Sequence, residues 1–268
     1  MEHPRAAQLD DSYFLPQGTV PSLANLSQVA MQDGHERGTY WCISLDERVI
    51  KTMYKDDMFI PSRALAVALA EEWESQADVI DLRDFHMNNL LAKGVRAGHD
   101  PSLRQHMESE LQKIIENDQI CFIEPEEGAG SQEYKSKLRT EQNKHIDKVF
   151  GIMSDEFGIK LNVFENLYNV TIDPSVLKAK QIVQELDPVA LTCLYQMAIS
   201  SKSAAIALCA LHGKLSIEEA VRASRIDEDY QIQSFGLVEG AHDLDESYLY
   251  TTFGAAKAIV NMAQLREI

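Results

Sequence analysis

The chain has 268 residues, of which 45% are hydrophobic and 25% charged, a balance typical of globular domains that excludes disordered and low-complexity chains. Forty-two acidic residues against 25 lysines and arginines give a net charge of −17, which argues against non-specific binding to nucleic acid or to anionic membranes. The longest wholly apolar run, residues 204–211, is too short to cross a bilayer. We therefore expect neither nucleic-acid binding nor membrane insertion.

The four cysteines, Cys42, Cys121, Cys193 and Cys209, lie far apart in the sequence. They form no C-x-x-C pair and no cysteine-histidine cluster with the spacing of a zinc site. We therefore expect no metal ion, no disulfide framework and a reducing compartment. Residues 1–5 match neither a secretion signal nor an organelle presequence.

The N-terminal part of the chain predicts a small antiparallel β domain over residues 12–62. Residues 1–37 are polar and rich in proline and glycine, so we expect an irregular lead that includes only the first part of this domain. Residues 39–45 are aromatic and β-favouring, and residues 49–54 can pair back with them as a hairpin. Residues 38–62 are therefore the predicted hairpin core.

Residues 63–268 are predicted to form a larger, mainly helical domain. Ser62 can cap the first helix, because its hydroxyl can accept an otherwise unpaired backbone N–H. Leu65, Leu69 and Trp73 follow at i, i+4 and i+8, so they share one helix face. We expect this face, including Trp73, to lie in the core.

The rest of the helical domain is predicted from the same capping and periodicity signals. In chain order we expect a helix from Ser102, an extended run over 120–123, a helix over 132–157 ended by Gly158, a helix opened by Pro174, apolar helices over 188–199 and 203–211, and a helix over 216–223. The two apolar helices are apolar on most of their circumference and should form a buried central pair. The predicted fold class is α+β, with a small antiparallel β-rich N-terminal domain followed by a larger, mainly α-helical C-terminal domain.

Enzyme motifs are broken wherever the sequence approaches one. The pair Gly128 and Gly130 lacks the third glycine of a nucleotide-binding loop, and the acidic runs near Asp227 and Asp243 lack the glycine that a calcium loop requires. We therefore expect no catalytic residue, no cofactor and no metal ligand. A small hydrolase or transferase using His86 or His242 beside a carboxylate remains an alternative, although no nucleophile with an orienting partner is identifiable.

The chain has no lysine or arginine between Arg225 and Lys257, but it has seven acidic residues there. Apolar residues such as Tyr230, Ile232 and Phe235 stand among them. We call residues 227–246 the acidic strip. An uncompensated negative field beside apolar anchors is the composition expected where a basic, aggregation-prone partner docks. Two readings without such a partner stay open: the strip only keeps the protein in solution, or the chain is a generic acidic scaffold.

The strip begins with a segment that resembles a known family. Residues 225–243 resemble the signature R-L-E-E-x-Y-Q-x-x-x-W-G-x-x-E-x-A-H-D of the ATP synthase assembly chaperones of the ATP-twelve family. Further blocks of the family pattern occur upstream in the same order: Pro61-Ser62 with Leu65-Ala66, residues 71–76, residues 117–122, and residues 201–203 with 205–208. Phe235 replaces the family tryptophan, and residues 86–94 depart from the family pattern.

The resemblance implies an ATP-independent, non-enzymatic chaperone of the mitochondrial matrix. Such a chaperone binds the free α subunit of the ATP synthase catalytic head, prevents its aggregation and promotes assembly of the α/β hexamer. The family fold, a small β-rich domain followed by a helical one, agrees with the division predicted above. We expect a protein that is monomeric when free. The predicted partner-binding residues are Asp227, Glu228, Asp229, Phe235, Glu239 and Asp243.

Overall fold

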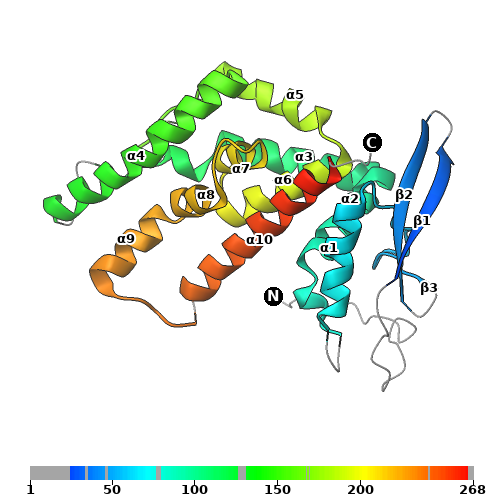
Figure 1. Ribbon diagram of the computed structural model, residues 1–268. Coiled ribbons are helices and arrows are strands. Elements are labelled where there is room, and N and C mark those ends of the chain that lie inside the picture. Colours follow the sequence, from blue (N-terminus) through cyan, green and yellow to red (C-terminus); the bar gives the residue numbers. More distant parts are fainter. Residues whose placement is uncertain are drawn as a thin grey trace, which may run out of the picture.

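A small antiparallel sheet lies at one end of an elongated body of helices (Figure 1). The computed structural model describes residues 25–33, 36–45, 48–76, 80–125, 131–166, 168, 170–240 and 242–264. The strands are β1 (Asn25–Asp33), β2 (Glu36–Leu45) and β3 (Arg48–Val49), in the order β1-β2-β3. The predicted α+β fold class is confirmed.

The helices of the body follow the sheet in the chain. They are α1 (Arg63–Glu74), η2 (Leu82–Asp84), α2 (His86–His99), α3 (Pro101–Glu116), η3 (Gln119–Cys121), α4 (Gln132–Phe157), η4 (Pro174–Val176), α5 (Leu177–Glu185), α6 (Pro188–Ser201), α7 (Ala204–Leu211), α8 (Ile217–Ser224), α9 (Ile226–Phe235) and α10 (His242–Ala263).

The pairing in the sheet differs from the predicted hairpin. The main partner of β2 is β1, with Asn25 opposite Ser44 at one end and Asp33 opposite Glu36 at the other. β3 adds only two pairs, so the predicted hairpin over 39–54 is right only next to its turn. β1 lies within residues 1–37, which the sequence argument treated as mainly irregular. Strand formation there depends on the partner that β2 supplies, which a local pattern does not reveal.

The sheet is joined to the helical body by the segment before α1. The backbone N–H groups of Trp41 and Ile60 each donate to the other residue's carbonyl, at 2.8 and 2.9 Å. Ser62 caps α1 as predicted, its hydroxyl accepting from the N–H of Leu65 at 3.1 Å. The same hydroxyl donates to the carbonyl of Met262 at 2.6 Å, so the first helix is tied to the last.

Trp73 lies at the edge of the core rather than inside it. Its side chain is half-buried, with its ring centroid 4.4 Å from that of Phe85 and its Nε1 donating to Asn88 Oδ1 at 3.2 Å. The neighbouring Glu72 carboxylate accepts from the N–H groups of Met87 and Asn88 and thereby caps α2. The expectation that Trp73 is a core residue is therefore wrong, because its indole bridges α1 and the start of α2.

Trp73→Ala should lower the free energy of unfolding by about 2–3 kcal/mol, less than the loss of about 3–5 kcal/mol for a fully buried large aromatic. Trp73→Phe keeps the ring contact and leaves Asn88 Oδ1 without its indole donor, a loss of about 1 kcal/mol. Urea denaturation of both variants measures the loss from removing the whole side chain and the loss from removing the hydrogen bond alone. Equal stability of Trp73→Ala and wild type would contradict this placement.

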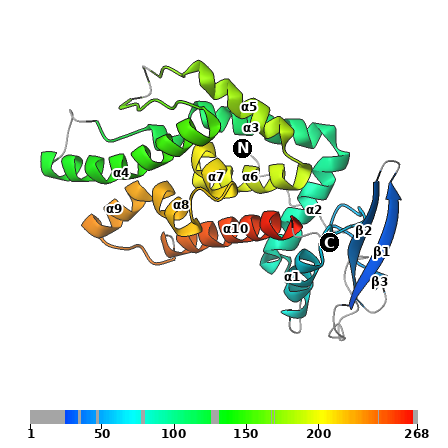
Figure 2. The ribbon, with the colours of Figure 1, turned by 45° about the horizontal axis from the view of Figure 1, so that its top comes forward.

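The predicted central helix pair is confirmed. All eight residues of α7 are buried, as are nine residues of α6. Figure 2 shows α6 and α7 in the middle of the body, with α3 and α5 on one side and α8 and α10 on the other. α4 spans the predicted residues 132–157, and Gly158 ends it in the left-handed conformation with φ 63°. The predicted extended run over 120–123 is wrong at its start, where η3 forms.

A buried carboxylate holds the beginning of α7. The side chain of Asp118 accepts from the N–H of Ala205 at 2.8 Å and from the N–H of Ile120 at 3.2 Å. Burial raises the pKa of Asp118 to about 6, although hydrogen bonds from the Ser203 hydroxyl and from backbone N–H groups oppose this rise. The carboxylate that holds the beginning of α7 is therefore protonated more easily than an ordinary aspartate.

Stability should depend on pH through Asp118. Because its folded pKa of about 6 lies above the ordinary value of 3.8, its contribution to stability is present below about pH 4 and is lost as pH rises through 6. The shift of about two pKa units corresponds to about 3 kcal/mol. Urea denaturation between pH 4.5 and 7.5 should show Asp118→Asn gaining on the wild type as pH rises. A pH-independent difference between the two proteins would refute this effect.

Candidate functional site

The acidic strip folds into α9, a short loop and the beginning of α10. Figure 1 shows this segment at the end of the body opposite the sheet, beside α4. None of the ten residues of α9, all of which the structure describes, is buried. α9 contacts α4 through Tyr134, whose ring centroid lies 4.8 Å from that of Tyr230 and 5.9 Å from that of Phe235. The segment is therefore exposed, and the rings of Tyr230 and Phe235 attach it to α4.

Most acidic residues of the strip lie at the N-terminal ends of its two helices. Asp227, Glu228 and Asp229 occupy the first turn of α9, and Asp243 and Asp245 occupy the first turn of α10. Carboxylates are favoured there because the N-terminal end of a helix carries a partial positive charge. Gly236 and Gly240, with φ of 94° and 76°, reverse the chain between the two helices. Both acidic turns thus belong to one loop-connected pair of helices.

The three acidic residues of α9 that were predicted to bind a partner already have contacts within the fold. Asp227 accepts from Gln142 Nε2 at 2.7 Å, Glu228 Oε1 lies 3.8 Å from Lys202 Nζ, and Asp229 Oδ1 lies 3.3 Å from Arg225 Nε. Burial raises the pKa of Asp227 and of Asp229, and neighbouring carboxylates add to both shifts. These side chains are half-buried. They supply negative charge and also fix α9 to the body.

The other three predicted residues are more exposed. Phe235 is 80% exposed, although its ring centroid lies 5.9 Å from that of Tyr134, and Glu239 and Asp243 are exposed. Neither of these two carboxylates has a hydrogen bond or ion pair to a described residue. The structure therefore brings all six predicted residues to one end of the molecule but leaves only Phe235, Glu239 and Asp243 fully available.

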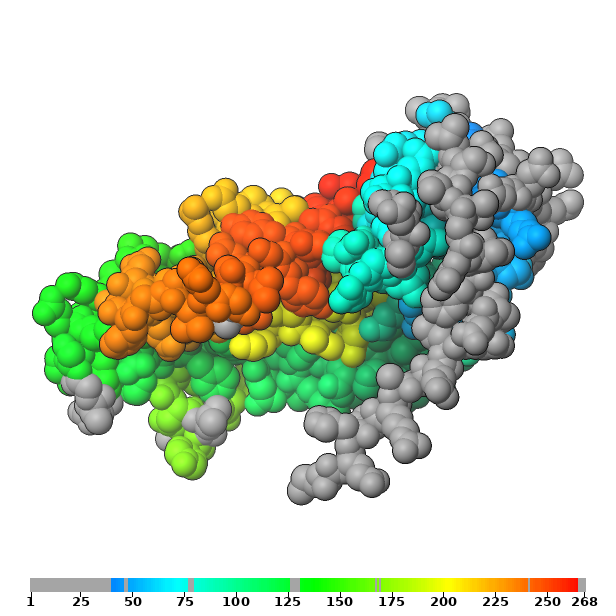
Figure 3. Space-filling model, turned by 90° about the horizontal axis from the view of Figure 1, so that it is seen from below, coloured from blue at the N-terminus to red at the C-terminus, as the bar shows by residue number. Residues whose placement is uncertain are grey.

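Exposed apolar side chains beyond the predicted set extend this surface. Leu237 and Val238 are 53% and 57% exposed in the loop, and Leu244 and Tyr248 are 62% and 52% exposed on α10. The Tyr248 hydroxyl accepts from Gln196 Nε2 of α6 at 3.1 Å. Figure 3 shows α6 beside α9 and α10 on one face of the molecule.

We define the α9–α10 face by its exposed apolar and acidic members. They are Phe235, Leu237, Val238, Glu239, Asp243, Leu244, Asp245, Glu246 and Tyr248. Sequence reasoning did not select Leu244 and Tyr248, because apolar residues four apart on a helix ordinarily indicate a core face. Ile199 of α6, 42% exposed, comes from a segment predicted to belong to a buried central helix pair. No local signal in the sequence distinguishes these three residues.

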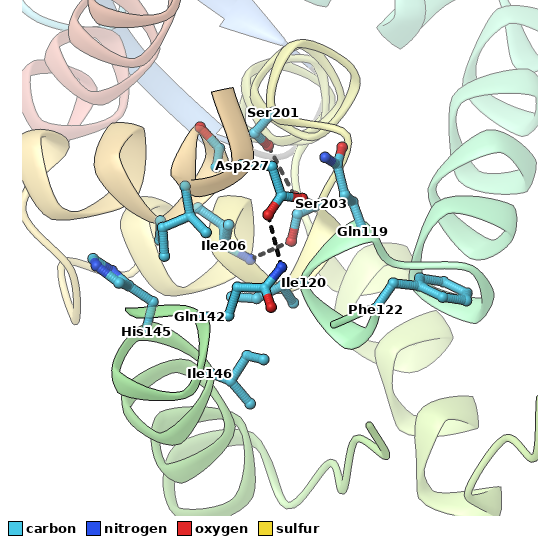
Figure 4. Close-up of a pocket in the computed structure, with 13 residues that line it drawn as sticks. Gln119, Ile120, Phe122, Gln142, His145, Ile146, Ser201, Ser203, Ile206 and Asp227 are labelled. Atoms are coloured by element: carbon cyan, nitrogen blue, oxygen red, sulfur yellow. Dashed lines mark hydrogen bonds between the residues drawn. The ribbon is translucent and has the colours of Figure 1, made fainter. Parts of the chain in front are cut away.

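A small cavity lies where α9 meets the body (Figure 4). It has a volume of about 30 Å³ and is lined by Gln119, Gln142, His145, Ser203 and Asp227 among others. Figure 4 shows the Gln142 amide reaching the Asp227 carboxylate across it. This space suits a water molecule rather than a metabolite, since ligand pockets usually exceed about 300 Å³.

His242, one of the two histidines considered for catalysis, has a structural contact. Val238 N–H donates to Nδ1 of His242 at 3.2 Å, which closes the loop before α10. Among the described residues, no group of three histidine, cysteine or acidic side chains could hold a metal ion. The alternative of a hydrolase or transferase gains no support from this geometry.

Comparison with known proteins finds similarity to one family. The family model described as ATP12 chaperone protein matches residues 26–154. The curated protein called Protein ATP12, mitochondrial, from Saccharomyces cerevisiae is 22% identical over 258 residues, covering 82% of this chain and 78% of the yeast protein. The chain is similar to the ATP12 chaperone family, as its sequence motifs indicated.

Solved structures of ATP12 proteins have the same fold as this chain. Atp12 from Paracoccus denitrificans is 23% identical with a TM-score of 0.74, covering 92% of this chain and 98% of that one. A mutant of the same protein is 22% identical with a TM-score of 0.75, covering 90% and 96% of the two chains. The Atu1473 protein from Agrobacterium tumefaciens is 21% identical with a TM-score of 0.74, covering 90% and 84%.

These matches confirm the recognised resemblance to a chaperone family for ATP synthase assembly. The family match covers the sheet and the helices through most of α4 and ends before α9. The role of the acidic strip therefore stays a prediction. No helix in the described part of the chain is long and apolar enough to span a bilayer.

Proposed function

We propose that this ATP12-family chaperone binds the free α subunit of the ATP synthase catalytic head through the α9–α10 face. In this role it prevents aggregation of the α subunit and promotes assembly of the α/β hexamer in the mitochondrial matrix, without ATP and without catalysis. The observation that carries the proposal is that exposed apolar side chains lie beside acidic side chains on one surface. Phe235 is 80% exposed and Leu244 62% exposed, and the exposed Glu239 and Asp243 of the same face form no ion pair with a described residue.

The apolar part of the face suits a partner that must be shielded from water. Large exposed apolar residues that gather on one surface usually mark an interaction site, whereas single ones are common everywhere. Phe235 and Tyr248 are aromatic, the residue class that most often anchors the centre of an interface. Burying them against a partner removes apolar area from water on both sides.

The acidic part of the face discriminates between partners by their charge. Glu239 and Asp243 can attract and orient a partner whose matching surface is basic, and they repel an acidic one. The contacts of Asp227, Glu228 and Asp229 within the fold favour a supporting role for these three residues. We assign direct contact to Phe235, Glu239 and Asp243, and assign the α9 acids to the local field and to holding α9 in place.

Co-expression with the α and β subunits, each in a separate experiment, followed by pull-down, tests the proposal. We expect selective recovery of α. Recovery of neither subunit, or equal recovery of both, would reject α-specific binding and favour the acidic-scaffold alternative. A second measurement follows light scattering of the isolated α subunit after dilution from denaturant. The chaperone should suppress the scattering equally with and without ATP.

A further inference from the structure

A cavity of about 350 Å³ lies between α3 and α5, away from the α9–α10 face. Figure 2 shows α3 and α5 together on the side of α6 and α7 opposite α10. α5 is fixed at both of its ends. Near its end, Arg104 Nη2 donates to the carbonyls of Gln184 and Leu186, both at 3.0 Å. Near its start, Lys178 Nζ donates to the carbonyl of Gly158 at 3.0 Å.

The inner part of the cavity is aliphatic. Leu111 and Ile115 of α3 line it together with Leu194 of α6 and Leu208 of α7, and all four are at most 3% exposed. Val183 of α5 closes it from the other side. Protein interiors leave few voids larger than a water molecule, and a volume of this size lies at the lower end of the range of small-molecule sites. The space therefore suits an alkyl chain.

The mouth of the cavity is polar and includes the charged side chains of Glu108, Lys113 and Lys180. Glu108 is paired with Arg104 at 2.8 Å, and Lys113 is paired with Glu110 at 2.6 Å. Lys180 has no ion pair to any residue that the structure describes. The amide and hydroxyl side chains of Gln105, Ser109, Gln112 and Gln184 surround the same opening. A negatively charged head group is thus complementary to this mouth.

We propose that the α3–α5 cavity binds a free aliphatic carboxylate, with its alkyl chain among Leu111, Ile115, Leu194 and Leu208 and its carboxylate at Lys180. The apolar chain replaces water against the aliphatic wall, and the head group gains a charge-assisted contact at the rim. This site does not depend on the binding of an ATP synthase subunit, because it lies on other helices than the α9–α10 face.

Titration of the full chain with sodium dodecanoate, below its micelle concentration, tests the proposal by calorimetry. We expect saturable 1:1 binding, and no binding of sodium acetate, which has no chain to bury. Lys180→Gln should weaken dodecanoate binding about tenfold, as expected for a lost hydrogen bond to a charged group. Dodecan-1-ol should bind more weakly than dodecanoate and should not respond to Lys180→Gln.

Two further variants locate the site. Ser109→Trp places a large ring at the mouth and should abolish binding, and Gln105→Trp serves the same purpose if the first variant does not fold. Lys160→Gln removes an exposed lysine outside the cavity and should leave binding unchanged. The proposal is overturned if dodecanoate does not saturate, if the mouth variants bind it normally, or if the alcohol binds as well as the acid.

Discussion

Gly94→Val should destabilise the protein by about 3 kcal/mol or more, the upper end of what overpacking costs in a rigid core. Gly94 is buried on α2 where this helix crosses α6. A Cβ at this position would lie 2.8 Å from the Cα of Val189 and 3.0 Å from its Cγ2. The nearer atom is backbone, so a rotamer change cannot relieve the contact, and α2 and α6 would have to separate.

Gly98, one turn further along α2, provides the matched control. A Cβ there would lie 3.5 Å from Pro188 Cγ, an ordinary van der Waals distance. Gly98→Ala should therefore be neutral or should stabilise by up to about 1 kcal/mol through its better helix propensity. Urea denaturation of the two variants compares them directly. Equal stability would show that α2 and α6 are not held at the spacing described.

Local signals explain which elements the sequence predicts well. The bounds of α4 are predictable because Ser131 caps its start and Gly158 ends it, both within the same stretch of chain. α6 and α7 are predictable because an apolar residue occupies nearly every position, which is sustainable only in the interior. In each case the physical cause lies within a few residues of the element that it shapes.

α2 and β1 are not predictable in this way, because their stabilising partners are distant in sequence. The N-terminus of α2 is capped by the Glu72 carboxylate, 15 residues before Met87, and not by a residue next to the helix. Gly94 and two asparagines also lower its helix propensity, and only the close contact with α6 explains the glycine. β1 becomes a strand because β2 pairs with it along its whole length.

The candidate site was predictable in composition but not in geometry. The absence of lysine and arginine between Arg225 and Lys257 is a sequence property, and it marks a segment that the structure places on the surface. The sequence did not reveal that Tyr230 packs on Tyr134, nor that Asp227 accepts from Gln142, because both partners belong to α4. Exposure of Leu244 and Tyr248 likewise depends on where α10 leaves the body. The structure thus identifies which residues of the acidic strip are exposed on the α9–α10 face and which ones attach the strip to the body.

Reversing two charges on this face should reduce capture of the α subunit about a hundredfold. In Glu239→Lys/Asp243→Lys, two carboxylates that would meet a basic partner become like charges, and a penalty of about 3 kcal/mol corresponds to that factor. Both side chains are exposed and make no ion pair with described residues, so the melting temperature should change little. Asp243 lies in the first turn of α10, where its reversal costs at most about 1 kcal/mol.

A control variant with the same net charge as the test variant separates the effect of the α9–α10 face from that of the overall charge of the protein. Asp155→Lys/Glu185→Lys reverses two exposed carboxylates on α4 and α5, and like the test variant it changes the net charge from −17 by +4, to −13. We expect this control to capture the α subunit as the wild type does. Phe235→Ser, which removes an aromatic anchor without altering charge, should weaken capture and leave its salt dependence unchanged. If both double variants lose capture equally, the charge of the whole protein and not the α9–α10 face attracts the partner.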